Sequence, residues 1–108
     1  MWGRRRKRTV FLEVPTECVL YLPLSLEKAS SSDMCPDHAQ ERIVLTHVEL
    51  QALKLVHLDN LSQAEAACRM GLPRSTFWRV LESARRKLIQ ALVERKPILI
   101  ASTERGQC

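Results

Sequence analysis

One stretch of the sequence constrains the fold more than any other, because a short capped helix, a glycine and a long arginine-rich helix follow one another. Ser62-Gln-Ala-Glu65 is a capping box, in which each of the two side chains accepts a hydrogen bond from the other residue's backbone N–H. It predicts a helix up to Met70, and Gly71 suits the left-handed residue that ends a helix. A second helix is predicted from Arg74 to Lys96, a stretch without glycine or proline. Its apolar residues recur at helical spacing: Phe77, Val80, Leu81, Ala84, Leu88 and Leu92.

The flanking sequence predicts one more helix and several short strands. Thr46-His-Val-Glu49 is a second capping box and predicts a helix that runs to about Leu58. Short apolar runs predict strands over Thr9–Val14, Val19–Leu22 and Ile98–Ala101, and residues 27–42 are polar and serine-rich, as in a linker or surface loop.

Together these elements predict a mainly α fold, a three-helix helix-turn-helix domain with short terminal β-strands. The helix-turn-helix pattern needs a small residue at the helix crossing, an apolar residue after the turn, and apolar residues that pack back from the second helix. Ala67, Leu72, Phe77 and Val80 meet these needs. We expect a basic arm, short strands and polar linker over residues 1–42, the helix-turn-helix over 43–96, and a strand and tail over 97–108. An αα-hairpin that binds no nucleic acid is the alternative.

Positive charge is concentrated in two parts of the chain, whose formal net charge is +5. Residues 9–68, between these parts, contain nine acidic side chains against Lys28, Arg42 and Lys54, so their net charge is −6. Clustered lysine and arginine favour a polyphosphate partner, because each neutralised phosphate releases condensed counterions. The first part is residues 69–96, and the second is the basic arm, which consists of Arg4, Arg5, Arg6, Lys7 and Arg8.

The outward face of the second predicted helix is the candidate DNA-binding surface. A rotation of 100° per residue places Ser75, Arg79 and Arg86 opposite the apolar face. Arg79 is the best candidate for a bidentate contact with guanine, and Trp78 is expected either at a thymine methyl or sugar wall, or against the N-terminal segment or a dimer partner. The full set of candidate DNA-binding residues is Gln63, Arg74, Ser75, Thr76, Trp78, Arg79, Arg85 and Arg86.

No residues suggest catalysis or a cofactor, and we expect a non-enzyme. The three histidines lack a nucleophile partner nearby in sequence, and no glycine-rich phosphate loop is present. Cys35-Pro-Asp-His38 is only a fragment of a metal site, which usually has four clustered ligands, so we expect no metal. Without a signal peptide or membrane span, we expect a cytoplasmic protein with reduced cysteines.

The sequence resembles the uncharacterised protein family numbered two hundred and fifty-one, short prokaryotic proteins described as predicted DNA-binding proteins. The likeness covers almost the whole chain and is most specific at Leu61-Ser-Gln-Ala-Glu-Ala-Ala67, Arg74-Ser-Thr-Phe77 and Leu81-Glu-Ser-Ala-Arg-Arg-Lys87. It implies a helix-turn-helix similar to region four of sigma factors, the part that reads the promoter −35 element. Pro73 departs from the family, which usually has a serine cap there, and it suits a first helical turn but offers no side-chain cap.

These observations favour a sequence-specific binder of double-stranded DNA, with transcriptional regulation as its role. One alternative is a protein–protein module that docks on RNA polymerase or another regulator. RNA is a weaker candidate, because its deep major groove does not admit a helix. A homodimer is expected if the strands Thr9–Val14 and Ile98–Ala101 pair with each other and across a two-fold axis, and a monomer that reads one half-site is the alternative.

Overall fold

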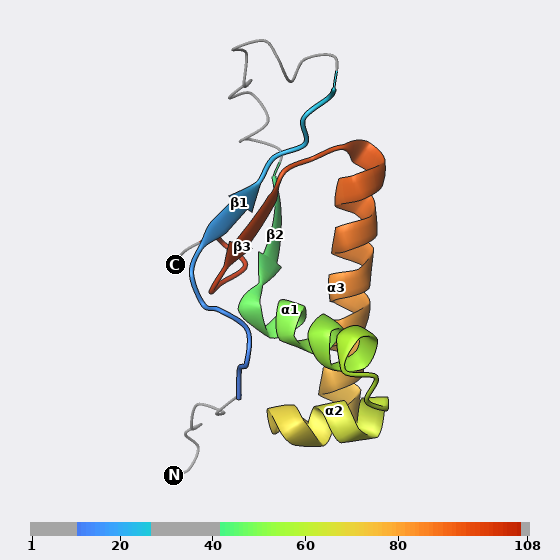
Figure 1. Ribbon diagram of the computed structural model, residues 1–108. Coiled ribbons are helices and arrows are strands. Elements are labelled where there is room, and N and C mark those ends of the chain that lie inside the picture. Colours follow the sequence, from blue (N-terminus) through green and yellow to red (C-terminus); the bar gives the residue numbers. More distant parts are fainter. Residues whose placement is uncertain (1–10, 27–41, 107–108) are drawn as a thin grey trace.

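The computed structural model describes residues 11–26 and 42–106. A small sheet lies beside the long helix α3, while α1 crosses between them and α2 lies at the far end of α3 (Figure 1). In the described residues, no helix is long and apolar enough to cross a membrane. The elements in chain order are β1 (Val19–Tyr21), β2 (Ile43–Thr46), α1 (His47–Leu53), η2 (Lys54–Leu58), α2 (Gln63–Met70), α3 (Arg74–Glu94) and β3 (Ile98–Ala101).

The sheet has the order β1-β3-β2, so the last strand of the chain lies in the middle. Leu99 of β3 is opposite Leu20 of antiparallel β1 and opposite Val44 of parallel β2. Parallel neighbours need a long crossover connection, and here the helices between β2 and β3 supply it. The sheet therefore combines one strand from each of the residue ranges 1–42, 43–96 and 97–108.

The predicted strands are partly confirmed. Val19–Leu22 and Ile98–Ala101 correspond to β1 and β3, whereas β2 was not predicted. The expected strand over Thr9–Val14 is wrong for Phe11–Val14, which is irregular, and residues 9–10 lie outside the described part. Its expected pairing with β3 is also wrong, because β1 and β2 occupy the two edges of β3.

The predicted first helix is confirmed in extent but changes its geometry halfway. The Thr46 hydroxyl accepts from the Glu49 backbone N–H at 3.2 Å, and the Glu49 carboxylate accepts from the Thr46 N–H at 2.9 Å, so the capping box is formed. After Leu53 the helix widens to the π-helical turn η2, where the Asp59 N–H reaches back to the Lys54 carbonyl at 3.0 Å. This wider turn ends at Leu58, the predicted end of the helix.

The long helix α3 begins where predicted and ends slightly earlier. Pro73 precedes it and forms no side-chain cap, and Arg95 ends it with a left-handed φ of 58°. Leu92 is wrongly predicted to be core, since it is 64% exposed, and Ala91 is buried in its place. The reason is that the side of α3 that carries Ala84 and Ala91 faces the sheet, where Ala84 packs with Leu45 and Ile100.

The cysteines differ from expectation at one position. Cys18 is disulfide-bonded, so the expectation of reduced cysteines is wrong for this residue, while Cys68 is a free and exposed thiol. Cys35 and His38, the fragment considered for a metal, lie outside the described residues. Within the described ranges, no group of three or more histidine, cysteine or acidic side chains is placed to hold a metal ion.

Candidate nucleic-acid interface

The candidate interface is built on a sharp corner between α2 and α3. Ser62 and Glu65 form the predicted capping box at the start of α2, with hydrogen bonds of 3.1 and 3.0 Å. Gly71 ends the helix with a φ of 76°, which side chains other than glycine adopt only at a cost. The Leu72 N–H then bonds to the Ala67 carbonyl at 2.9 Å, and α3 begins after Pro73. The chain thus passes from one helix to the next within three residues.

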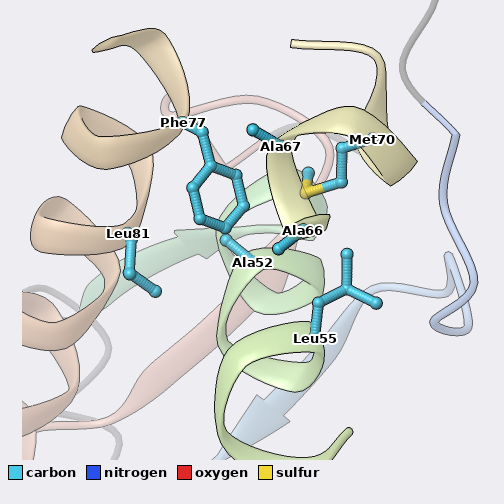
Figure 2. Packing of buried hydrophobic residues seen from close by; sticks show 7 residues of the cluster. All are labelled: Ala52, Leu55, Ala66, Ala67, Met70, Phe77 and Leu81. Atoms are coloured by element: carbon cyan, nitrogen blue, oxygen red, sulfur yellow. The ribbon is translucent and has the colours of Figure 1, made fainter. Parts of the chain in front are cut away.

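The two helices of this corner approach each other closely. Figure 2 shows Ala66, Ala67 and Met70 of α2 packed toward Phe77 of α3, and all four side chains are buried. Alanine at the crossing leaves room for the phenylalanine ring between the helices. The burial predicted for Ala67 and Phe77 is confirmed, and the partly buried Leu72 and Val80 pack against the same cluster. Close packing fixes the direction of α3 relative to α2.

Three exposed guanidinium groups lie on α3, those of Arg79 and Arg86 on its outward side and that of Arg74 at its first position. Arg74, Arg79 and Arg86 are exposed and form no ion pair with another described residue. Ser75 is exposed beside them, and Trp78 exposes 52% of its surface. The geometry therefore brings five of the eight predicted site residues to solvent on one helix. Their positive charges lack an internal counterion, which favours an anionic partner.

The other predicted site residues are less available. Arg85 is half-buried, pairs with Glu82 at 2.9 Å and donates to the His57 ring at 3.4 Å. Thr76 and Gln63 are half-buried near the starts of their helices. These three residues can reach a ligand only with part of their surface, so the arginines carry the main charge of the interface.

Glu49 links α1 to α3 in a way that the sequence analysis missed. Its buried carboxylate accepts from the Ser83 hydroxyl at 2.6 Å and from the Lys87 ammonium at 2.9 Å, besides its capping bond to Thr46. Lys87, which belongs to the basic block of the sequence, is therefore neutralised within the fold. The only signal in the sequence is that Ser83 and Lys87 lie four residues apart and so share one side of a helix.

The N-terminal segment is held against α1 and α2 by side chains instead of strand pairing. The Gln51 side-chain oxygen accepts from the backbone N–H groups of Glu13 and Val14 at 2.6 and 3.0 Å. The Glu13 carboxylate pairs with Arg69 at 2.6 Å and with Lys54 at 3.2 Å. Hydrogen bonds from Arg69 and then Lys54 lower the pKa of Glu13, so it is ionised at neutral pH. The segment thus has a fixed course past α2.

This course determines where the basic arm joins the fold. Residues Arg4, Arg5, Arg6, Lys7 and Arg8 lie outside the described part of the chain. The Phe11 backbone N–H donates to the Met70 carbonyl at 3.4 Å, at the end of α2. The described part of the chain therefore begins beside the corner between α2 and α3.

Comparison with known proteins identifies relatives in archaea and bacteria. A family model described as "Protein of unknown function DUF134" matches residues 19–107. Proteins named "UPF0251 protein" are 48% identical over 61 residues in Pyrococcus abyssi, which is 56% of each chain, and 42% identical over 96 residues in Methanosarcina mazei, which is 89% of this chain and 52% of the relative. One from Vibrio parahaemolyticus is 39% identical over 69 residues, 64% of this chain and 72% of the relative.

Two limits define the reach of these similarities. The chain spans about half the length of the first archaeal relatives that it matches, since the shared part covers 56%, 54% and 53% of the three Pyrococcus proteins. No solved structure matches the chain. Neither the names of these relatives nor the family description states a ligand.

Proposed function

This chain belongs to the UPF0251 family, and we propose that it binds double-stranded DNA in a sequence-specific manner through α2 and α3. In this proposal α2, the turn at Gly71 and α3 form a helix-turn-helix similar to region four of sigma factors, and α3 is the recognition helix. The observation that carries the proposal is the presence on α3 of three exposed arginines, Arg74, Arg79 and Arg86, that form no ion pair within the described part of the chain.

The first half of α3 has the properties that major-groove recognition requires. A helix fits this groove, and its N-terminal residues approach the base edges while later basic residues contact phosphates. Ser75 and Arg79 are exposed within the first two turns. Arginine can donate two parallel hydrogen bonds to guanine O6 and N7, so Arg79 is the base reader in this proposal. Arg86 lies two turns further along and suits the phosphate backbone.

Trp78 supports an interface on the same surface. Its indole is half-exposed although tryptophan is highly buried on average. In the proposed complex the ring contacts a thymine methyl group or the sugar wall of the groove. Arg74 at the first position of α3 and Gln63 at the first position of α2 are close to helix N-termini, where phosphate groups are favoured.

The alternative function keeps the fold and changes the partner. Sigma region four belongs to the transcription machinery, so the resemblance also allows a module that docks on RNA polymerase or another regulator. Under this alternative Trp78 and the arginines contact protein instead of DNA. We favour DNA, because three unpaired arginines on one helix match repeated phosphates and guanine edges better than a single acidic partner. A cytoplasmic location follows from this proposal and stays a prediction.

The experiment is a selection of bound duplexes from a random-sequence library, repeated at two salt concentrations with the full chain. The proposal predicts an enriched motif that persists at the higher salt, with total binding reduced as counterion release requires. Binding without an enriched motif would contradict sequence-specific recognition. No binding of duplex DNA at either salt concentration would favour the protein-docking alternative.

A further inference from the structure

The outward side of α3 changes character along its length. Up to residue 86 it carries the exposed arginines Arg79 and Arg86, whereas the last two turns expose Ile89, Leu92 and Val93 at 57%, 64% and 74%. Large aliphatic side chains gain nothing from phosphate groups and are unfavourable in water. The exposure of these side chains in the last two turns of α3 is therefore not explained by DNA contact.

This apolar surface continues from α3 onto the first strand. Leu92 lines a hollow of about 170 Å³ together with Tyr21 and Leu22, which are themselves exposed. In Figure 1 the C-terminal end of α3 lies at the end of the molecule opposite α2. We call Tyr21, Leu22, Ile89, Leu92 and Val93 the apolar end surface. It is separated from the corner that carries the candidate DNA interface.

The strand beside this surface has an open edge. In the described residues β1 pairs with β3 alone, on one of its two sides. β1 itself, Val19–Tyr21, contains neither a charged side chain nor a proline, and Pro23 follows two residues after its end. Native proteins usually protect an open edge with charge or proline, and an unprotected edge favours pairing with another strand.

We propose that the apolar end surface binds a second copy of this chain across a two-fold axis. A two-fold interface brings the same residues together from both copies, so the surface must not repel itself. All five residues of the apolar end surface are uncharged. Of the two cations that border the hollow, Lys96 is paired with Glu94 at 2.9 Å, whereas Arg95 is exposed and forms no ion pair with a described residue. An acidic partner protein would find only Arg95 to pair with there, whereas a second copy of the chain presents the same aliphatic and aromatic groups.

The size of the surface also fits a dimer. Five side chains that are 40% to 74% exposed offer several hundred Å² of contact, the size of patch that marks an interaction site. A standard interface buries about 800 Å² per partner, and pairing of two β1 edges would add backbone contacts. Because Ile89, Leu92 and Val93 are centred near residue 91, we place the two-fold axis at that level of α3.

A dimer of this kind predicts the form of the DNA site, and this part rests on the proposed function. Arg79 lies about 18 Å along α3 from the level of residue 91. Antiparallel α3 helices would place the two Arg79 residues about 36 Å apart, close to one turn of DNA. The selected site should then be two-fold symmetric, with half-sites about one helical turn apart.

Sedimentation velocity of the full chain without DNA, over roughly 1 to 100 µM, tests the dimer. We expect the wild type to be dimeric and Leu92→Glu and Val93→Lys to be monomeric, each with an unchanged far-ultraviolet circular dichroism spectrum. The control is Leu58→Glu, which alters an equally exposed leucine (76%) on η2 and should stay dimeric. A monomeric wild type, or a Leu58→Glu variant that dissociates as readily, would overturn the proposal.

The dimer and the proposed function fail in distinguishable ways. A dimer that shows no preference among duplexes contradicts the function and leaves the interface standing. A monomer that selects one asymmetric half-site removes the interface and supports the function. A dimer that selects an asymmetric site overturns the predicted spacing.

Discussion

Single residues fix the position of α3, the helix proposed to contact DNA. Glu49 caps α1 and also accepts hydrogen bonds from Ser83 and Lys87 of α3. Glu65 performs the same capping role on α2, with its side chain exposed. The two capping boxes have the same sequence pattern, but Glu49 is buried and Glu65 is exposed. The same substitution at both positions therefore isolates the effect of the bonds from Glu49 to α3.

We predict that Glu49→Gln lowers the free energy of unfolding by about 1–3 kcal/mol, because glutamine keeps the cap but loses the charge-assisted bonds from Lys87 and Ser83. The matched variant Glu65→Gln should change it by less than about 0.5 kcal/mol, since glutamine also serves in a capping box. Urea denaturation of both variants measures the difference. Equal effects would show that the link from Glu49 to α3 contributes nothing to stability.

Arg79 is the residue on which the proposed base reading depends. We predict that Arg79→Ala weakens binding to the selected duplex by about 1–3 kcal/mol and relaxes the preference at one base position. Arg105→Ala, which removes an exposed arginine from the C-terminal turn, is the control and should leave the motif unchanged. An unchanged motif in Arg79→Ala would exclude this residue as a base reader.

Residue patterns predicted the helix ends around the candidate site, but not which of its charged side chains are neutralised. Local signals sufficed for Gly71 and both capping boxes, because helix ends are fixed by hydrogen bonds within a few residues. The pairing of Lys87 with Glu49, 38 residues earlier in the chain, could not be predicted. A charge that is exposed on a helical projection is neutralised only when another element folds against it.

At the scale of elements, the corner between α2 and α3 depends on small side chains at the crossing. Ala67 is buried between the helices, whereas Ala64 lies on the exposed side of α2. A larger side chain at position 67 must displace Phe77 or move α3. The same change at position 64 places the larger side chain in solvent.

We predict that Ala67→Leu lowers the free energy of unfolding by about 1–3 kcal/mol through overpacking. It should abolish specific DNA binding without altering any side chain on the DNA-facing side. Ala64→Leu should leave both properties close to wild type. Thermal unfolding and a gel-shift titration measure the two effects, and normal stability with full binding in Ala67→Leu would disprove the proposed packing.

The helices were predictable from the sequence, whereas one of the three strands of the sheet, β2, was not. Helix signals are local, with caps at Thr46 and Ser62 and periodic apolar residues along α3. β2 is a four-residue strand whose parallel partner lies beyond all three helices, so no nearby pattern marks the pairing. The burial of Ala91 instead of Leu92 followed from the same cause, since the position of the sheet decides which side of α3 is covered.

The molecule as a whole has exposed arginines toward one end and exposed apolar side chains toward the other. The corner of α2 and α3, the unpaired arginines and the attachment of the basic arm lie together, because Phe11 bonds to Met70. The apolar end surface lies at the other end of α3. Such polarity would let two copies associate while both corners remain free.

We predict that deletion of residues 1–8 lowers affinity for all duplexes alike and flattens the salt dependence. Each of up to five phosphate contacts contributes about −0.9 to the slope of log affinity against log salt. A full-length variant with Arg4, Arg5, Arg6, Lys7 and Arg8 replaced by glutamine is the control for length and should behave like the deletion. A changed sequence preference with an unchanged slope would instead place the arm in the minor groove.

The most direct test of sequence-specific DNA binding is a titration of the wild-type chain with the selected duplex and with a scrambled duplex of equal length and composition. Both titrations are made at the same near-physiological salt concentration, so the phosphate contribution is shared. The proposal predicts at least about a 1,000-fold tighter Kd for the selected duplex, in the range of specific recognition. Equal Kd values within a few-fold would contradict it and leave α3 as a non-specific basic surface.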